Sequence, residues 1–196
     1  MPLKLISPGG GSVILNPAST GSSVTLTVPA VNANVITDTA NSVTQTMMSS
    51  GLAGTGPAFH VYRNTNQTVT SSTNTKIQFN VKQFDTASCF DATTNYRFTP
   101  NVAGYYFITL SIWFESWSSG PWIADILFNG GSLFTNAEYT SASYFGPQNK
   151  HLSGLIYMNG STDYVEASCY TGGSTTAVIY GAQNRTYMCG YLARAA

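Results

Sequence analysis

Apolar and polar side chains alternate with a period of two in four stretches of this chain, within residues 24–28, 76–82, 106–114 and 164–170. This spacing is typical of β-strands that bury one face. Helical periodicity is convincing nowhere, so the sequence predicts an all-β protein. The positions expected to face the core are Val24, Leu26 and Val28; Ile77, Phe79 and Val81; Tyr106, Ile108, Leu110, Ile112 and Phe114; and Val165, Ala167 and Cys169, with Glu166 and Ser168 on the opposite face.

Turn residues separate the apolar stretches. Asn129-Gly130-Gly131, Asn159-Gly160 and Gly172-Gly173 supply residues that tolerate positive φ. Many short strands joined by such turns favour an antiparallel sandwich or barrel over alternating βα units.

The composition divides the chain into three parts. Residues 1–38 are rich in Val and Thr, contain Pro8, Pro17 and Pro29, and lack Trp and Tyr. This β-rich arm is too short to build its own core. Residues 39–56 are small and polar and predict a linker. Aromatic residues concentrate in residues 57–196, which predict the main domain.

The charge content removes several function classes. The chain has 196 residues, with Lys+Arg 8 balancing Asp+Glu 8, and only 8% of it is charged. A neutral chain lacks the basic surface that binds phosphates, so we expect no nucleic-acid partner. The longest apolar stretch, residues 105–114, is too short to span a bilayer, so we expect no membrane insertion.

The N-terminus and the cysteines indicate assembly in a cytoplasm. Residues 1–11 contain one Lys and reach a Pro-Gly-Gly-Gly run before an apolar signal core forms. Cys89, Cys169 and Cys189 are odd in number and form no CxxC pair, so we expect reduced thiols.

A family resemblance begins at Phe98. The stretch of residues 98–110 places a Phe, five residues, Gly104, one residue and Tyr106, followed by alternating apolar positions. It resembles the signature of the globular head of complement component one-q, a branch of the tumour-necrosis-factor jelly-roll superfamily. The closing run around Gly190 is similar to that family's terminal strand, and the resemblance spans about residues 57–193.

Several features depart from the family pattern. Ile108 and Leu110 stand where the signature prefers aromatic residues, Cys189 replaces a Ser, and no collagen repeat precedes the head. The resemblance implies an antiparallel jelly-roll sandwich that assembles as a homotrimer. The 12 Tyr, 10 Phe and 3 Trp exceed what one small core uses, and a trimer interface would bury the surplus.

The arm has a resemblance of its own. Its Gly-rich start and the Thr-Leu-Thr-Val-Pro-Ala run at residues 25–30 resemble arms of bacteriophage tail-fibre and other virion proteins. We therefore expect a virion structural protein, assembled in the host cytoplasm, whose arm attaches to other virion proteins or intertwines with its copies.

Catalytic chemistry finds little support in the residues. His60 and His151 are the two histidines, and neither lies near a nucleophile motif. The acidic residues are scattered, and Asp163 and Glu166 would point to opposite faces of a strand. We expect no enzyme, no catalytic residue and no cofactor. Some relatives bind calcium near the three-fold apex, but the chain has no Asp-rich calcium loop, so no metal ligand is assigned.

The residues support ligand binding better than catalysis. Aromatic side chains among Ser, Asn and Thr could stack on sugar rings of a host glycan or contact a host protein, although packing in the core or at the trimer axis is the competing interpretation. The candidates are Trp117, Trp122, Tyr139, Tyr144 and Phe145.

Three functions remain open. The leading hypothesis is a trimeric fibre or spike whose head projects from a phage particle and touches the host. A trimeric capsid decoration protein is the close alternative, and a secreted complement-type binding protein is a further one.

Overall fold

The computed structural model describes residues 3–6, 12–15, 56–116, 119–141, 147–172 and 176–196. The chain divides into two compact units, Met1–Val43 and Thr44–Ala196. In the first unit, β1 (Leu3–Ile6) pairs antiparallel with β2 (Ser12–Leu15), with Leu3 opposite Leu15. The strand expected over residues 24–28 and most of the linker expected over residues 39–56 lie outside the described residues.

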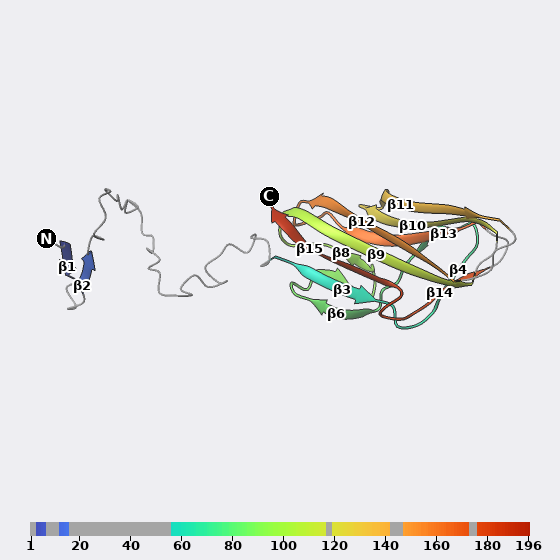
Figure 1. The fold of residues 1–196 in the computed structure, drawn as a ribbon, viewed down its shortest axis with the longest axis horizontal. Helices are drawn as coiled ribbons and strands as arrows, with labels where there is room; N and C mark the ends of the chain where they lie inside the picture. Colours follow the sequence, from blue (N-terminus) through green and yellow to red (C-terminus); the bar gives the residue numbers. More distant parts are fainter. Residues whose placement is uncertain (1–2, 7–11, 16–55, 117–118, 142–146, 173–175) are drawn as a thin grey trace, which may run out of the picture. The chain divides into compact units, whose positions relative to one another are not determined.

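The second unit is built from two antiparallel sheets (Figure 1). The six-stranded sheet has the order β11-β10-β13-β8-β7, with β5 beside β13. Its strands are β5 (Thr75–Lys76), β7 (Phe90–Asp91), β8 (Arg97–Phe98), β10 (Gly120–Phe128), β11 (Gly131–Thr140) and β13 (Val165–Thr171).

The seven-stranded sheet is organised around β9. Its order is β4-β14-β9-β15-β3-β6, and β12 pairs with the other edge of β9. Its strands are β3 (Ala58–Tyr62), β4 (Gln67–Val69), β6 (Val81–Asp85), β9 (Gly104–Ser116), β12 (Gln148–Met158), β14 (Ala177–Ile179) and β15 (Tyr187–Ala195).

The core lies between the sheets and is rich in aromatic rings. All five core positions expected from residues 106–114 are fully buried on β9. Phe98 stacks on Phe59 with ring centroids 4.3 Å apart and meets Tyr106 edge-on at 5.5 Å. At the other end, Phe114 meets Trp122 edge-on at 5.0 Å. Such pairs add directional contacts to apolar burial and hold the sheets in register.

The turn at Asn129-Gly130 is confirmed as a hairpin. Both residues have positive φ, 50° and 82°, and Phe128 lies opposite Gly131 in the register that joins β10 to β11. Positive φ at both central positions is the requirement of a type I′ turn, which matches the twist of antiparallel strands.

The prediction of a strand over residues 76–82 is only partly right. Ile77 and Phe79 are buried and Gln78 and Asn80 exposed, as alternation predicts, but residues 77–80 belong to no strand. The Gln67 side chain replaces the missing ladder: its Nε2 donates to the carbonyl of Lys76 at 2.7 Å, and its Oε1 accepts from the N–H of Gln78 at 3.0 Å.

The prediction for residues 164–170 is right about the strand and wrong about its outer face. Val165, Ala167 and Cys169 are fully buried, but Glu166 and Ser168 on the other face are buried as well. Lys76 pairs with Glu166 at 2.5 Å, from the segment that carries β5 beside β13.

None of the described segments is a helix able to cross a membrane.

Candidate assembly and binding surfaces

The outer face of the seven-stranded sheet carries large apolar side chains. Those of β9 that alternate with the core positions point outward, and the register aligns them with outward positions of β12 and β15. Tyr157, Tyr105 and Arg194 form one row across the sheet, and Leu155, Phe107 and Tyr191 form the next. We call the five apolar members of these rows the aromatic face: Tyr105, Phe107, Leu155, Tyr157 and Tyr191.

The aromatic face is exposed in the single chain. Its five side chains are between 36% and 55% exposed. Rings contact one another across the strands: Tyr105 and Tyr157 lie 5.4 Å apart edge-on, and Phe107 and Tyr191 lie 5.9 Å apart. A contiguous apolar patch of this kind on a solvent-exposed surface marks an interaction site.

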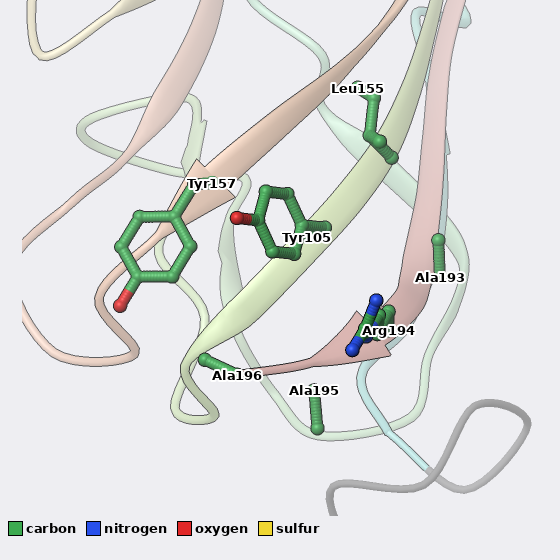
Figure 2. A pocket seen from close by; sticks show the side chains of 7 residues that line it. All are labelled: Tyr105, Leu155, Tyr157, Ala193, Arg194, Ala195 and Ala196. Atoms are coloured by element: carbon green, nitrogen blue, oxygen red, sulfur yellow. The ribbon is translucent and has the colours of Figure 1, made fainter.

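A shallow hollow of about 420 Å³ lies at the end of this face (Figure 2). Tyr105 from β9 and Tyr157 from β12 form one wall, and Arg194 with its neighbours on β15 forms the other. The strand register skips Ala193 between Leu192 and Arg194, so a bulge shapes this wall.

The next row of the sheet places His60 beside Cys189. The His60 ring stacks on Tyr187 at 5.5 Å, with Phe84 at 6.1 Å and Tyr62 at 6.4 Å. Its Nδ1 is buried, with no hydrogen-bond partner among the described residues. Burial lowers the pKa of His60 below its ordinary 6.5.

The structure corrects one of the five aromatic residues predicted to bind a ligand. Trp122 is 1% exposed and packs on Phe114, so its ring cannot stack on an external sugar. Tyr139, on β11, is 77% exposed and remains available. Trp117, Tyr144 and Phe145 lie outside the described residues.

The signature residues have structural roles. Phe98 and Tyr106 belong to the ring stack of the core, and the Tyr106 hydroxyl donates to the carbonyl of Val102 at 2.7 Å. Burial raises the pKa of that hydroxyl, and the nearby Cys89 adds a smaller effect. A Cβ at Gly104 would lie 2.4 Å from the Arg194 carbonyl oxygen, and one at Gly190 would lie 2.5 Å from Ile108. Both glycines therefore permit close strand contact.

The described carboxylates are engaged in local structure. Asp125 accepts hydrogen bonds from Thr135 at 2.6 Å and Ser132 at 2.8 Å. Asp91 accepts three backbone N–H groups, from Thr94, Thr93 and Asn95, which lower its pKa. Further contacts are Asp85 with the N–H groups of Cys89 and Phe90 and with Lys82, Asp163 with the Asn159 N–H and the Asn129 amide, Glu138 with Lys150 and Gln148, Glu166 with Lys76, and Glu115 with Asn66.

No group of three or more His, Cys, Asp or Glu side chains in the described part of the chain is arranged to hold a metal ion. All three cysteines are free: Cys89 and Cys169 are buried and Cys189 is half-buried. Burial raises the pKa of Cys169 to about 12, and the charge of Asp125 adds to the shift. These thiols are therefore poor nucleophiles in the folded chain.

Sequence reasoning did not single out the aromatic face. The signal lay in residues 105–114, where Tyr105 and Phe107 interrupt the alternation and make the strand apolar on both sides. A strand that is apolar on both faces is covered on both faces. The surplus of aromatic residues pointed to such a surface without placing it.

No protein-family model and no curated protein matches the chain. Solved structures do match, with similar coverage. The globular domain of the zebrafish complement 1qA protein is 19% identical and has a TM-score of 0.53, covering 71% of this chain and 99% of its own. The Eiger TNF of S. frugiperda is 11% identical and has a TM-score of 0.58, and the match covers 72% of this chain and 95% of the Eiger chain. Murine APRIL is 9% identical and has a TM-score of 0.55, and the match covers 70% of this chain and 98% of the APRIL chain.

At these identities the likeness establishes the fold. The shared architecture agrees with the family expected from Phe98, Gly104 and Tyr106, and with the two antiparallel sheets described above. The main domain of this chain is a jelly roll of the complement one-q and tumour-necrosis-factor type.

Proposed function

We propose that the head, residues 57–196, is a non-enzymatic binding module that assembles as a homotrimer through the aromatic face. One observation carries the proposal: five large apolar side chains from three neighbouring strands are exposed together on the outside of the seven-stranded sheet. Covering them removes apolar area from water at roughly 25 cal/mol per Å².

Further copies of the same chain are the partner that best fits this face. Of the seven described residues around the hollow at its end, only Arg194 has a charged side chain, so few charged side chains need to be desolvated on association. The family resemblance implies three-fold assembly of the head. In a closed three-fold ring every copy covers its neighbour, so no aromatic face is left open.

Sedimentation equilibrium of the purified full chain tests the assembly. We expect a species of three times the 20.9 kDa chain mass. Leu155→Lys and Tyr191→Lys place a charge within the aromatic face and should shift the species to monomer. Tyr139→Lys is the matched control, because Tyr139 is exposed on the other sheet and should leave the trimer unchanged. A monomeric parent chain, or equal effects of all three substitutions, would refute the proposal.

We further propose that the trimer is a bacteriophage virion protein of the fibre or spike type, assembled in the host cytoplasm. Residues 1–38 would attach to other virion proteins while the head contacts a glycan or protein of the host surface. Support comes from the resemblance of the arm to virion proteins and from the three free thiols, which suit assembly in a reducing compartment. We propose no role for nucleic acid, membrane insertion, catalysis or a cofactor.

Two other functions share the trimeric head. A capsid decoration protein would use it to cement neighbouring capsomers, and a secreted complement-type protein would use it outside a virion. Immunogold electron microscopy of phage particles with antibody to this chain separates the three. Labelling at the tail or at projecting fibres supports the proposal, uniform labelling of the capsid supports decoration, and unlabelled particles refute a virion role.

A further inference from the structure

A second hollow, of about 410 Å³, lies at the end of β9 away from the aromatic face. It is lined by Trp113 and Glu115 of β9, Pro147 before β12, Tyr180 after β14, and Arg185 in the turn before β15. Trp113 and Tyr105 are eight positions apart on β9, about 26 Å at roughly 3.3 Å per residue. The two hollows are therefore separate surfaces.

Arg185 is held by aromatic rings instead of a carboxylate. Its guanidinium carbon lies 3.9 Å from the centroid of the Trp113 ring and 5.8 Å from that of Tyr180. Within the described residues, the ion pairs join Lys76, Lys82 and Lys150 to acidic partners and leave Arg185 out. A guanidinium stacked by its face keeps its N–H donors at its edge for another acceptor.

Glu115 and the turn that carries Arg185 are fixed by neighbouring side chains. Asn66 donates from Nδ2 to the Glu115 Oε2 at 2.9 Å and accepts at Oδ1 from the N–H of Gly181 at 3.0 Å. The fully buried Thr186 donates to the carbonyl of Tyr180 at 2.7 Å and accepts from the N–H of Trp113 at 3.2 Å. Strand ends and turn are thus held together before any ligand arrives, which lowers the entropic cost of binding.

The hollow lies at the end of the head opposite its connection to the preceding chain. The N–H of Leu192 donates to the carbonyl of Pro57 at 3.0 Å, and the N–H of Ala196 to that of Ala103 at 3.2 Å, which places the start of the head beside the end of β15. Figure 1 shows the C-terminus at one end of the head and β4 and β14 at the other. In a head attached through residue 57, this end is the distal one.

We propose that this hollow binds a neutral hexose unit of a glycan. Arg185 supplies hydrogen-bond donors, the Glu115 carboxylate supplies acceptors, and Trp113, Tyr180 and Pro147 supply apolar surface for the C–H groups of a sugar ring. Adjacent hydroxyls of a hexose donate and accept together, which matches a donor and an acceptor that line the same hollow. The inference deepens the proposed function, on which it rests for the biological role of the site.

The charges favour a neutral sugar over an acidic one. Glu115 and Arg185 contribute one negative and one positive charge to the lining, and the other lining residues that the structure describes, Trp113, Pro147 and Tyr180, are uncharged. A carboxylate or phosphate on the ligand would gain from Arg185 but would be repelled by Glu115. A hydroxylated, uncharged ring uses both groups without that repulsion.

The full chain should be tested by biolayer interferometry against immobilised neutral oligosaccharides of glucose, galactose, mannose or N-acetylglucosamine, with uronate-containing oligosaccharides alongside. We expect saturable binding of at least one neutral oligosaccharide. Arg185→Gln and Glu115→Gln should each raise its Kd at least tenfold, because each removes a charge-assisted hydrogen bond. Glu115→Gln keeps an oxygen that can accept from Asn66. Arg97→Gln is the matched control, since Arg97 stacks on Tyr164 at 4.2 Å elsewhere and should leave Kd unchanged.

The outcomes separate this inference from the assembly proposal. Near-ultraviolet circular dichroism verifies that each variant is folded. If Arg185→Gln misfolds, Arg185→Lys is used in its place. It retains the positive charge but lacks the planar guanidinium, so we expect the same loss of affinity. Absence of neutral binding, tighter binding of the uronates, or an unchanged Kd in both variants overturns the site. A parent chain that sediments as a trimer but binds no neutral oligosaccharide overturns the site alone, whereas a parent chain that binds one as a monomer overturns the assembly alone.

Discussion

The ion pair between Lys150 and Glu138 should respond very differently to removal of its two members. Lys150 lies on β12 and its side chain is 3% exposed, whereas Glu138 lies on β11 and its side chain is 48% exposed. The pair links the edges of the two sheets. Removing Glu138 leaves a buried ammonium group without its carboxylate, while removing Lys150 leaves a carboxylate that water already reaches.

The expected magnitudes follow from that asymmetry. Loss of one partner from a buried ion pair lowers the free energy of unfolding by roughly 3–5 kcal/mol. The partial exposure of Glu138 reduces this loss, so we expect Glu138→Ala to lower the free energy of unfolding by about 2–3 kcal/mol. Lys150→Met retains the apolar stem and needs no counter-ion, so its cost should stay within about 1 kcal/mol of zero. At roughly 2–4 °C per kcal/mol, Glu138→Ala should lower Tm by about 4–12 °C.

Thermal unfolding at a fixed chain concentration checks this prediction. The double variant Glu138→Ala/Lys150→Met should have a Tm close to that of Lys150→Met alone, because it contains no unpaired buried ammonium group. The hydrogen bond from Lys150 is the main cause that lowers the pKa of Glu138 below its ordinary 4.5. The pair therefore stabilises the parent above that pH and loses this contribution as pH falls through the lowered pKa. Equal losses in both single variants, or a double variant as unstable as Glu138→Ala, would refute the reasoning.

Two further predictions concern aromatic positions and pH. In urea unfolding, Trp122→Ala should lower the free energy of unfolding of the head by about 3–5 kcal/mol because it leaves a cavity in the core. Tyr139→Ala should change that free energy by less than about 0.5 kcal/mol because Tyr139 is exposed. Similar losses in the two variants would contradict this reasoning. Because the pKa of His60 is lowered, the folded chain binds fewer protons than the unfolded chain just below pH 6.5, so stability should fall as pH drops through that region. His60→Phe should flatten this part of the stability profile, and an unchanged profile would show that His60 is not its source.

The core positions of β9 follow from the period of two in the sequence. Every core position expected on β9 is buried, because side chains two positions apart lie on the same face of a strand. The prediction that Trp122 binds a ligand is wrong, although the sequence contains the signal for burial: Trp122, Ala124 and Ile126 share one face of β10 and are all buried. The polar neighbours of Trp122 in the chain favour an exposed ring, but its place in the period of two requires a buried one.

Other features depended on contacts between distant segments. The Gln67 amide that replaces a strand ladder at residues 76–78 and the Lys76–Glu166 pair that fills the outer side of β13 have no local sequence pattern. The same holds for the second hollow, where Trp113 and Arg185 meet across 72 residues of chain. Expectations for residues 16–55, 117–118 and 142–146 remain predictions.

The place of β15 in the sheet has a consequence for biosynthesis. This strand, the last of the head along the chain, lies between β9 and β3 and pairs with both. A nascent head therefore lacks a central strand until the ribosome has passed residue 195, so its seven-stranded sheet closes only after β15 has been synthesised. Until then β3 and β9 have unpaired edges that need protection from aggregation. Because β15 also contributes Tyr191, an incomplete chain lacks part of the aromatic face and would be excluded from assembly.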